Sequence, residues 1–118
     1  MKQPVQCHLW QKENLTNEDI NIKNNFELLY TFEEESHLWR YLLKCKECGQ
    51  LYFYEFYEEI DWKEGNDPQY RTFIPIESKE EAENMAKMKS FELLKISPRL
   101  QYDWPANADK SKIYWIRK

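Results

Sequence analysis

The stretch YLLKCKECGQLYFYEFYEEIDW, residues 41–62, decides the fold that this sequence predicts. Two apolar, aromatic runs flank a C-x-x-C-G turn formed by Cys45, Cys48 and Gly49. Because glycine permits the backbone reversal of a tight turn, these runs predict two antiparallel strands joined by a hairpin. In the second run the side chains alternate between two faces, one apolar and one that becomes acidic. The apolar face carries Tyr52, Tyr54, Phe56, Ile60 and Trp62.

Further strand-like runs on both sides of this hairpin extend it into a meander. Aromatic and β-branched residues predict these strands at 5–12, 26–32, 37–44, 70–77 and 112–118. Residues 13–25 are rich in asparagine and predict a loop with one helical turn near 16–19. Pro75 predicts that its strand ends there or lies at a sheet edge, because proline donates no N–H to a neighbour.

One helix is predicted to begin after Ser78. Serine is a favourable helix cap, and Glu81 three positions later completes a capping box. The inward stripe of this helix consists of Ala82, Met85 and Ala86, with Met88 on its flank. We therefore expect a single domain over residues 1–118 of the α+β class. Its antiparallel meander has four to six strands, one main helix packed on one face, and the C-x-x-C-G turn at one end.

Composition and charge limit the function classes. The chain has 118 residues, a net charge of −4, three cysteines and an aromatic share of 16%. No apolar run approaches the ~20 residues of a membrane helix, and the first residues lack a signal-peptide segment. We therefore expect a cytoplasmic protein with no membrane partner. The negative charge also argues against direct binding of nucleic acid.

Catalytic motifs are missing from the sequence. The two glycines are too far apart in the sequence for a P-loop and too few for a G-x-G-x-x-G loop, and no G-x-S-x-G occurs. Cys7 and His8 would point to opposite faces of a strand, which is the wrong geometry for a nucleophile and its base. Paired carboxylates are available, but in this composition they are more typical of a solvated sheet face. We expect a protein that is not an enzyme.

The C-x-x-C-G turn has three interpretations. As half of a zinc knuckle, two thiolates two residues apart would converge on one tetrahedral ion. The other ligands would come from Cys7, His8 and His37, and the set we select is Cys45, Cys48, Cys7 and His37. A redox pair is less favoured, because such thiols lie at helix starts. The favoured interpretation is a metal-free turn with packed thiols. We expect no cofactor, with a structural zinc as the alternative.

Acidic residues gather after the cysteine hairpin. Between residues 55 and 67 there are six acidic residues and one lysine, a local charge of −5. One interpretation is an acidic, aromatic surface that docks a basic protein partner, since opposite charges speed encounter and aromatic side chains anchor complexes. The other is a solubilising outer face. For partner contact we select Glu55, Glu58, Glu59, Asp61 and Trp62.

Three segments carry a resemblance to a known group of proteins. Residues 42–76, PRLQYDWP at 98–105 and KIYWIRK at 112–118 resemble small bacterial immunity proteins paired with polymorphic or contact-dependent growth-inhibition toxins. The resemblance implies a cytosolic protein that binds a cognate toxin domain, often a nuclease, and blocks its active site or an essential surface. The family's C-x-x-C-G pattern corresponds to Cys45, Cys48 and Gly49.

The resemblance and the charge pattern lead to one functional prediction. We expect a non-enzymatic immunity protein that neutralises a basic toxin domain through the acidic, aromatic surface, because carboxylates can occupy the place of phosphates on a nuclease. The alternative is a zinc-knuckle adaptor that docks on a nucleic-acid-handling complex.

Overall fold

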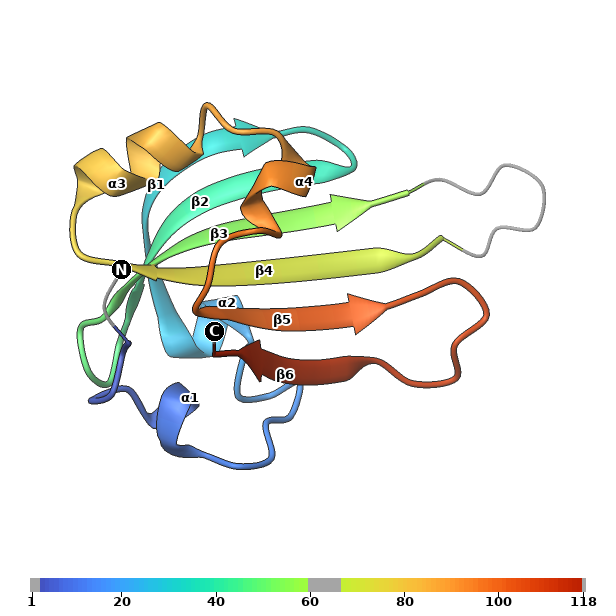
Figure 1. The fold of residues 1–118 in the computed structure, drawn as a ribbon, viewed down its shortest axis with the longest axis horizontal. Helices are drawn as coiled ribbons and strands as arrows, with labels where there is room; N and C mark the ends of the chain where they lie inside the picture. The colour runs from blue at the N-terminus through green and yellow to red at the C-terminus, as the bar shows by residue number, and fades with distance from the viewer. Residues whose placement is uncertain (1–2, 60–66, 118) are drawn as a thin grey trace.

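The computed structural model describes residues 3–59 and 67–117. Its strands form one antiparallel sheet in sequence order, so each strand pairs with the one before it (Figure 1). The strands are β1 (Phe26–Glu34), β2 (Leu38–Cys45), β3 (Leu51–Glu58), β4 (Gln69–Ile76), β5 (Arg99–Trp104) and β6 (Lys112–Ile116). The predicted α+β class and the antiparallel meander are confirmed, with six strands in the sheet.

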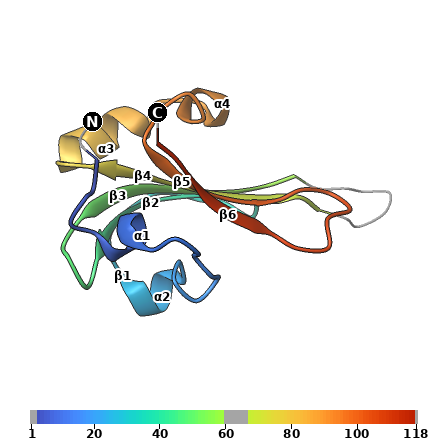
Figure 2. The same ribbon diagram turned by 60° about the horizontal axis from the view of Figure 1, so that its bottom comes forward.

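Four short helices accompany the sheet in the described residues, in place of the one main helix that was predicted. They are α1 (His8–Gln11), α2 (Ile22–Asn25), α3 (Lys79–Met85) and α4 (Ser90–Leu93). Figure 2 shows α1 and α2 on one face of the sheet and α3 and α4 on the other. The sheet is therefore the middle layer of three.

The first edge strand, β1, links the two faces. Its pairing with β2 shifts register between Leu28 and Tyr30 and again between Thr31 and Glu33. Such bulges bend a strand and increase its twist. Phe26 at the start of β1 consequently packs in the core beneath α1, whereas Phe32 packs against the core beneath α3.

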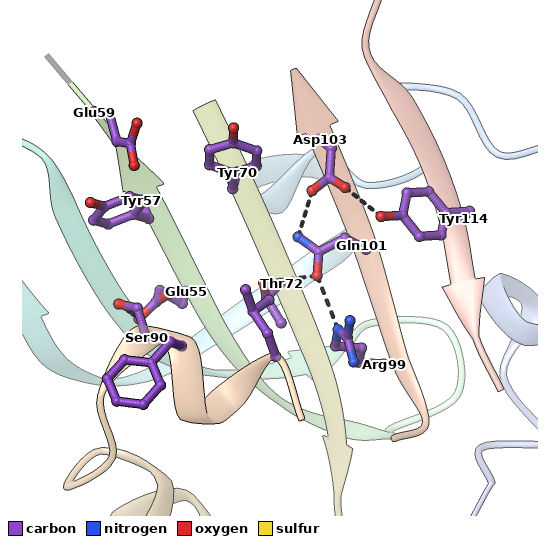
Figure 3. Close-up of a pocket in the computed structure, with 12 residues that line it drawn as sticks. Glu55, Tyr57, Glu59, Tyr70, Thr72, Ser90, Arg99, Gln101, Asp103 and Tyr114 are labelled. Carbon is purple, nitrogen blue, oxygen red and sulfur yellow. Dashed lines mark hydrogen bonds between the residues drawn. The ribbon is translucent and has the colours of Figure 1, made fainter. Parts of the chain in front are cut away.

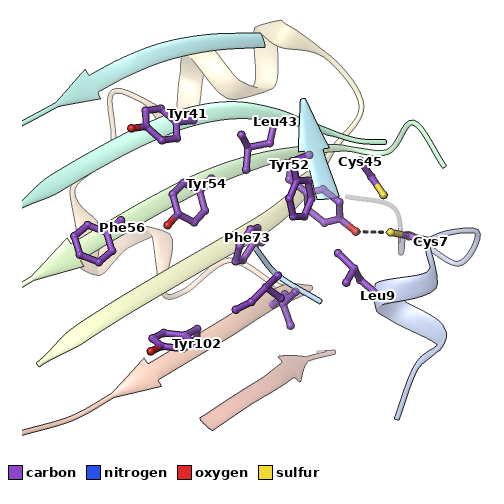
Figure 4. Close-up of a cluster of buried hydrophobic side chains, with 13 residues drawn as sticks. Cys7, Leu9, Tyr41, Leu43, Cys45, Tyr52, Tyr54, Phe56, Phe73 and Tyr102 are labelled. Carbon is purple, nitrogen blue, oxygen red and sulfur yellow. Dashed lines mark hydrogen bonds between the residues drawn. The ribbon is translucent and has the colours of Figure 1, made fainter. Parts of the chain in front are cut away.

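The core on the α1 face is built largely from aromatic side chains (Figure 4). Tyr52, Tyr54 and Phe73 are almost completely buried there, and the rings of Tyr54 and Phe73 lie 4.8 Å apart. Leu9 from α1 and Ile20 from the following loop cover these rings. This core fixes the amino-terminal segment against the sheet.

The core on the α3 face is smaller, and most of its side chains are not aromatic. Phe53 and Ile74 from the sheet pack against Ala82 and Met85 of α3 and against Leu93 of α4. The Ser78 hydroxyl accepts a hydrogen bond from the Glu81 N–H, as the predicted cap requires. Strand β3 is thus apolar on both faces over its first half, and not on one face alone.

Of two predictions about individual segments, the first is wrong and the second holds to within one residue. Residues 5–12 do not form a strand: the chain turns into α1, which places Leu9 in the core instead of adding backbone to a sheet edge. Pro75 was predicted to end its strand or to lie at a sheet edge, and β4 ends one residue later, at Ile76. Pro75 is tolerated because pairing between β4 and β5 reaches only as far as Phe73, so no β5 carbonyl needs its missing N–H.

Candidate metal centre and aromatic cleft

The cysteines of the hairpin meet the amino-terminal segment at one end of the sheet. Cys45 ends β2, and the turn that follows passes through Cys48 to Gly49, whose N–H donates to the Cys45 carbonyl oxygen. Cys7 lies immediately before α1 and His8 begins that helix. Three side chains each offer one ligand atom here, and these atoms all lie within 4.8 Å of one another: Cys7 Sγ, a ring nitrogen of His8 and Cys45 Sγ. This is a candidate metal centre.

Cys48 adjoins this group of three. Its thiol lies near the thiols of Cys7 and Cys45, so three sulfur atoms and one imidazole gather in the same region. Cys7 and Cys45 are completely buried, whereas Cys48 and His8 are only partly buried. All three cysteines are free.

Hydrogen-bond donors surround the sulfur atoms. The Tyr52 hydroxyl donates to Cys7 Sγ over 3.1 Å (Figure 4). The backbone N–H groups of Leu9 and Gln50 lie near the thiols of Cys7 and Cys48, respectively, and act to lower the pKa of each thiol. Each of these amides lies two residues after the cysteine that it contacts. Burial nevertheless raises the pKa of the Cys7 thiol to about 12, so without a cation this thiol is protonated at neutral pH.

The structure brings together three of the four selected metal ligands, Cys7, Cys45 and Cys48. It places the fourth, His37, elsewhere. His37 precedes β2, at the opposite end of that strand from Cys45, and its ring contacts Glu58 Oε1 at 3.2 Å. Cys45 lies eight positions after His37 along extended chain, a distance of about 26 Å. His8 occupies the position expected for His37. His8 was among the candidate ligands named from the sequence. In a strand at 5–12 its side chain would have pointed away from that of Cys7, whereas at the start of α1 the two side chains lie on the same side.

A cleft opens on the α3 face of the sheet beside α4, with a volume of about 590 Å³ (Figure 3). We call it the α4 cleft. Its floor consists of side chains from β3, β4, β5 and β6, and its wall consists of the exposed Phe91 of α4 and the exposed Leu94, which directly follows α4. Its lining residues are Glu55, Tyr57, Glu59, Tyr70, Thr72, Ser90, Phe91, Leu94, Arg99, Gln101, Asp103 and Tyr114.

Hydrogen bonds fix the polar floor of the α4 cleft. Asp103 accepts hydrogen bonds from the Tyr114 hydroxyl and, over 2.8 Å, from Gln101 Nε2. Gln101 Oε1 accepts from Thr72 and from Arg99 Nε, both over 3.2 Å. Burial and the bond to Asp103 raise the pKa of Tyr114 to about 12. The floor is therefore a preorganised row of polar groups with a carboxylate near its open end.

Aromatic rings stand along the same floor. Tyr57 and Tyr70 are stacked with ring centroids 6.5 Å apart, and Glu59 follows Tyr57 on the same side of the chain. Burial and the neighbouring Glu59 and Asp103 raise the pKa of Tyr70. Carboxylates and electron-rich ring faces both attract cations, so this end of the cleft suits a positively charged group.

Of the residues selected for partner contact, the three that the structure describes, Glu55, Glu58 and Glu59, do not lie together on one exposed surface. Glu55 is 4% exposed and its Oε2 lies 2.8 Å from Arg40 Nη2, so its charge is neutralised inside the molecule. Glu58 accepts from Gln69 and contacts His37. Glu59 is exposed at the mouth of the α4 cleft. Asp61 and Trp62 lie outside the described residues.

Sequence reasoning missed the cleft residues from later strands. Tyr70, Asp103 and Tyr114 lie on β4, β5 and β6, and pairing places Tyr70 opposite Asp103. A signal for them was available: in an antiparallel meander, polar and aromatic residues in alternate positions of successive strands share one face.

Comparisons of the chain with protein-family models, curated proteins and solved structures found no match. No helix within residues 3–59 and 67–117 combines the length and the apolar character needed to cross a membrane. Fold and sites together define a small three-layer α+β protein with a Cys/His cluster able to bind a metal and a separate aromatic, carboxylate-bearing cleft.

Proposed function

We propose that this protein is a non-enzymatic binding protein whose α4 cleft receives a positively charged side chain of a partner protein. The observation that carries the proposal is the position of two carboxylates, Glu59 and Asp103, beside the rings of Tyr57, Tyr70 and Tyr114 in one open cleft. A volume of about 590 Å³ accommodates an arginine or lysine side chain with part of its neighbours.

The cleft separates its charges. Arg99 donates to the Ile96 carbonyl oxygen and to Gln101, which holds its guanidinium at the α4 end of the floor. Glu59 and Tyr70 lie toward the opposite end (Figure 3). An incoming cation therefore meets carboxylates and rings before it meets Arg99. The exposed side chains of Phe91 and Leu94 add apolar contact area at the rim, as the anchors of protein interfaces do.

The resemblance to immunity proteins supplies the class of partner. We propose a cognate toxin domain with a basic surface, held by the cleft and thereby kept from its substrate. Cytoplasmic location follows from the same proposal, because an immunity protein meets its toxin inside the cell. Glu55 and Glu59 belong both to the acidic surface selected from the sequence and to the lining of the α4 cleft, and of these two only Glu59 is exposed.

Co-expression tests this function. The carboxyl-terminal domain encoded by the reading frame immediately upstream is expressed with and without this protein, and growth is measured. We expect this protein to restore growth and Glu59→Lys combined with Tyr70→Ala to abolish the rescue. Glu83→Lys is the matched control, because Glu83 is an exposed acid on α3 away from the cleft. Equal killing with and without the wild-type protein rejects the proposal.

A zinc-knuckle adaptor is the second candidate function, favoured by the Cys/His cluster. In that case the cluster would organise a docking surface for a larger nucleic-acid-handling complex. Co-purification of such a complex with the wild-type chain, lost in Cys45→Ser and retained in Glu59→Lys, distinguishes the adaptor from the immunity protein.

A further inference from the structure

We propose that Cys7, His8, Cys45 and Cys48 bind one zinc ion in a closed Cys3His site that ties the amino-terminal segment to the β2–β3 hairpin. This inference goes beyond the proposed binding function and does not depend on it. It rests on the three-ligand cluster, the adjoining Cys48 thiol and the donors around the sulfur atoms.

The spacing of the ligand atoms suits a tetrahedral ion. Zinc–sulfur and zinc–nitrogen bonds of about 2.3 and 2.0 Å place neighbouring ligands about 3.5–3.8 Å apart. Cys45 Sγ and the His8 Nδ1 atom lie 4.0 Å apart, and the three ligand atoms of the cluster all lie within 4.8 Å of one another. Small side-chain rotations therefore close the site around an ion, and Cys48 supplies the fourth ligand.

The backbone around two of the sulfur atoms has the form of a zinc knuckle. The N–H of Leu9 lies near the Cys7 thiol and the N–H of Gln50 near the Cys48 thiol, in each case from two residues further along the chain. Amide donors in this position stabilise the negative charge of a metal-bound thiolate. The repeat of the same arrangement on two separate segments is not required for packing two small apolar thiols.

Tyr52 completes the surroundings of the site. Its hydroxyl donates to Cys7 Sγ over 3.1 Å from a fully buried position. A donor of this kind orients a ligand and tunes its basicity. His8 Nδ1 also lies 3.2 Å from Glu47 Oε2, a contact that zinc ligation through Nδ1 would replace. No other cluster of three or more such ligands occurs in the part of the chain that the structure describes.

The site has a structural consequence. Cys7 and His8 belong to the segment that covers the aromatic core, whereas Cys45 and Cys48 belong to the hairpin. Zinc binding would join elements about 40 residues apart in sequence, in the manner of a closed structural site that contributes directly to folding.

The experiment uses the full chain, expressed in zinc-supplemented medium and purified under reducing conditions. We expect about one zinc per chain by elemental analysis. Replacement by cobalt(II) should give a thiolate-to-cobalt charge-transfer band and the strong visible absorption of a tetrahedral ion. A purified chain without metal that also gives no charge-transfer band with cobalt overturns the proposal.

Variants test the ligand assignment. His8→Gln and Cys48→Ser should weaken cobalt affinity more than about 100-fold, and Tyr52→Phe by about 10–100-fold. His37→Gln is the matched control and should bind as the wild type does. Affinity unchanged in His8→Gln, or lost in His37→Gln, overturns the assignment. Because His8 is partly exposed, His8→Gln should fold even if a cysteine variant does not.

Discussion

Arg40 and Glu55 form a buried ion pair between β2 and β3 at directly opposed positions. Arg40 also donates to the backbone oxygens of Ala86 and Met88, over 3.1 and 2.7 Å, and Glu55 accepts from the Ser90 hydroxyl. The pair thus satisfies carbonyl groups that the end of α3 leaves without helical partners. One pair of side chains fastens the α3–α4 connection to the middle of the sheet.

Removing one member of this pair should be strongly destabilising. Glu55→Leu leaves a guanidinium buried without its counter-charge, and we expect the free energy of unfolding to fall by about 3–5 kcal/mol. Urea denaturation measures this. The double variant Arg40→Met with Glu55→Leu should recover much of the loss, since no buried charge then remains.

The exposed pair of His37 and Glu58 provides the comparison. Because its histidine is half exposed, His37→Gln should change the free energy of unfolding by less than about 1 kcal/mol. A loss in Glu55→Leu no larger than that in His37→Gln would show that the interior pair has no special role in stability.

At the scale of elements, the hairpin between β2 and β3 depends on the conformation of Gly49. Its φ is +80°, a region that L-residues avoid. A Cβ atom there would meet only the flexible end of Lys44, 3.8 Å away, so a substitution is limited by backbone conformation and not by space.

Gly49→Ala should therefore lower the free energy of unfolding by about 1–2 kcal/mol, the conformational cost of a left-handed alanine. Gly49→Asn should cost less, because asparagine adopts this region more readily. Chemical denaturation of both variants checks the prediction. Equal stability of Gly49→Ala and the wild type would contradict it.

The elements differ in how far the sequence predicts them. Alternation over several residues specifies β2, β3 and β4, and Ser78 with Glu81 specifies the start of α3. Helix α1 has four residues, too few to show a helical period, so the apolar residues near Leu9 suggested a strand. That error also decided the choice between histidines, because His8 joins Cys7 only when a helix begins between them.

The cleft was less predictable than the strands for a related reason. Glu55 and Glu59 are both glutamates on the same face of one strand, and the sequence does not distinguish them. Glu55 lies opposite Arg40 and beneath α4, whereas Glu59 lies beyond α4. Where α4 ends on the sheet decides which carboxylate is buried. That position depends on the packing of Leu93 and Met85, which no local pattern encodes.

At the scale of the whole molecule, buried members of the eight tyrosines make the stability of the fold depend on pH. Burial raises the pKa of Tyr52 and Tyr54 in the α1-face core, and burial with smaller contributions from neighbours raises those of Tyr41, Tyr70 and Tyr114. A phenol with a raised pKa in the folded state stabilises the fold fully below its unfolded pKa of 10.0. That contribution is lost as the pH rises through the folded value.

The protein should accordingly unfold at alkaline pH, beginning above pH 10, because the unfolded chain then releases phenolic protons that the folded chain retains. Near-ultraviolet circular dichroism and tyrosinate absorbance, recorded together against pH, should change in one cooperative step. Tyr54→Phe removes one buried phenol and should move the midpoint to higher pH, whereas Tyr30→Phe, at an exposed position, should leave it in place. If tyrosinate absorbance reached its full value while the dichroism remained native, the aromatic core would be open to solvent and the packing beneath α1 would need revision.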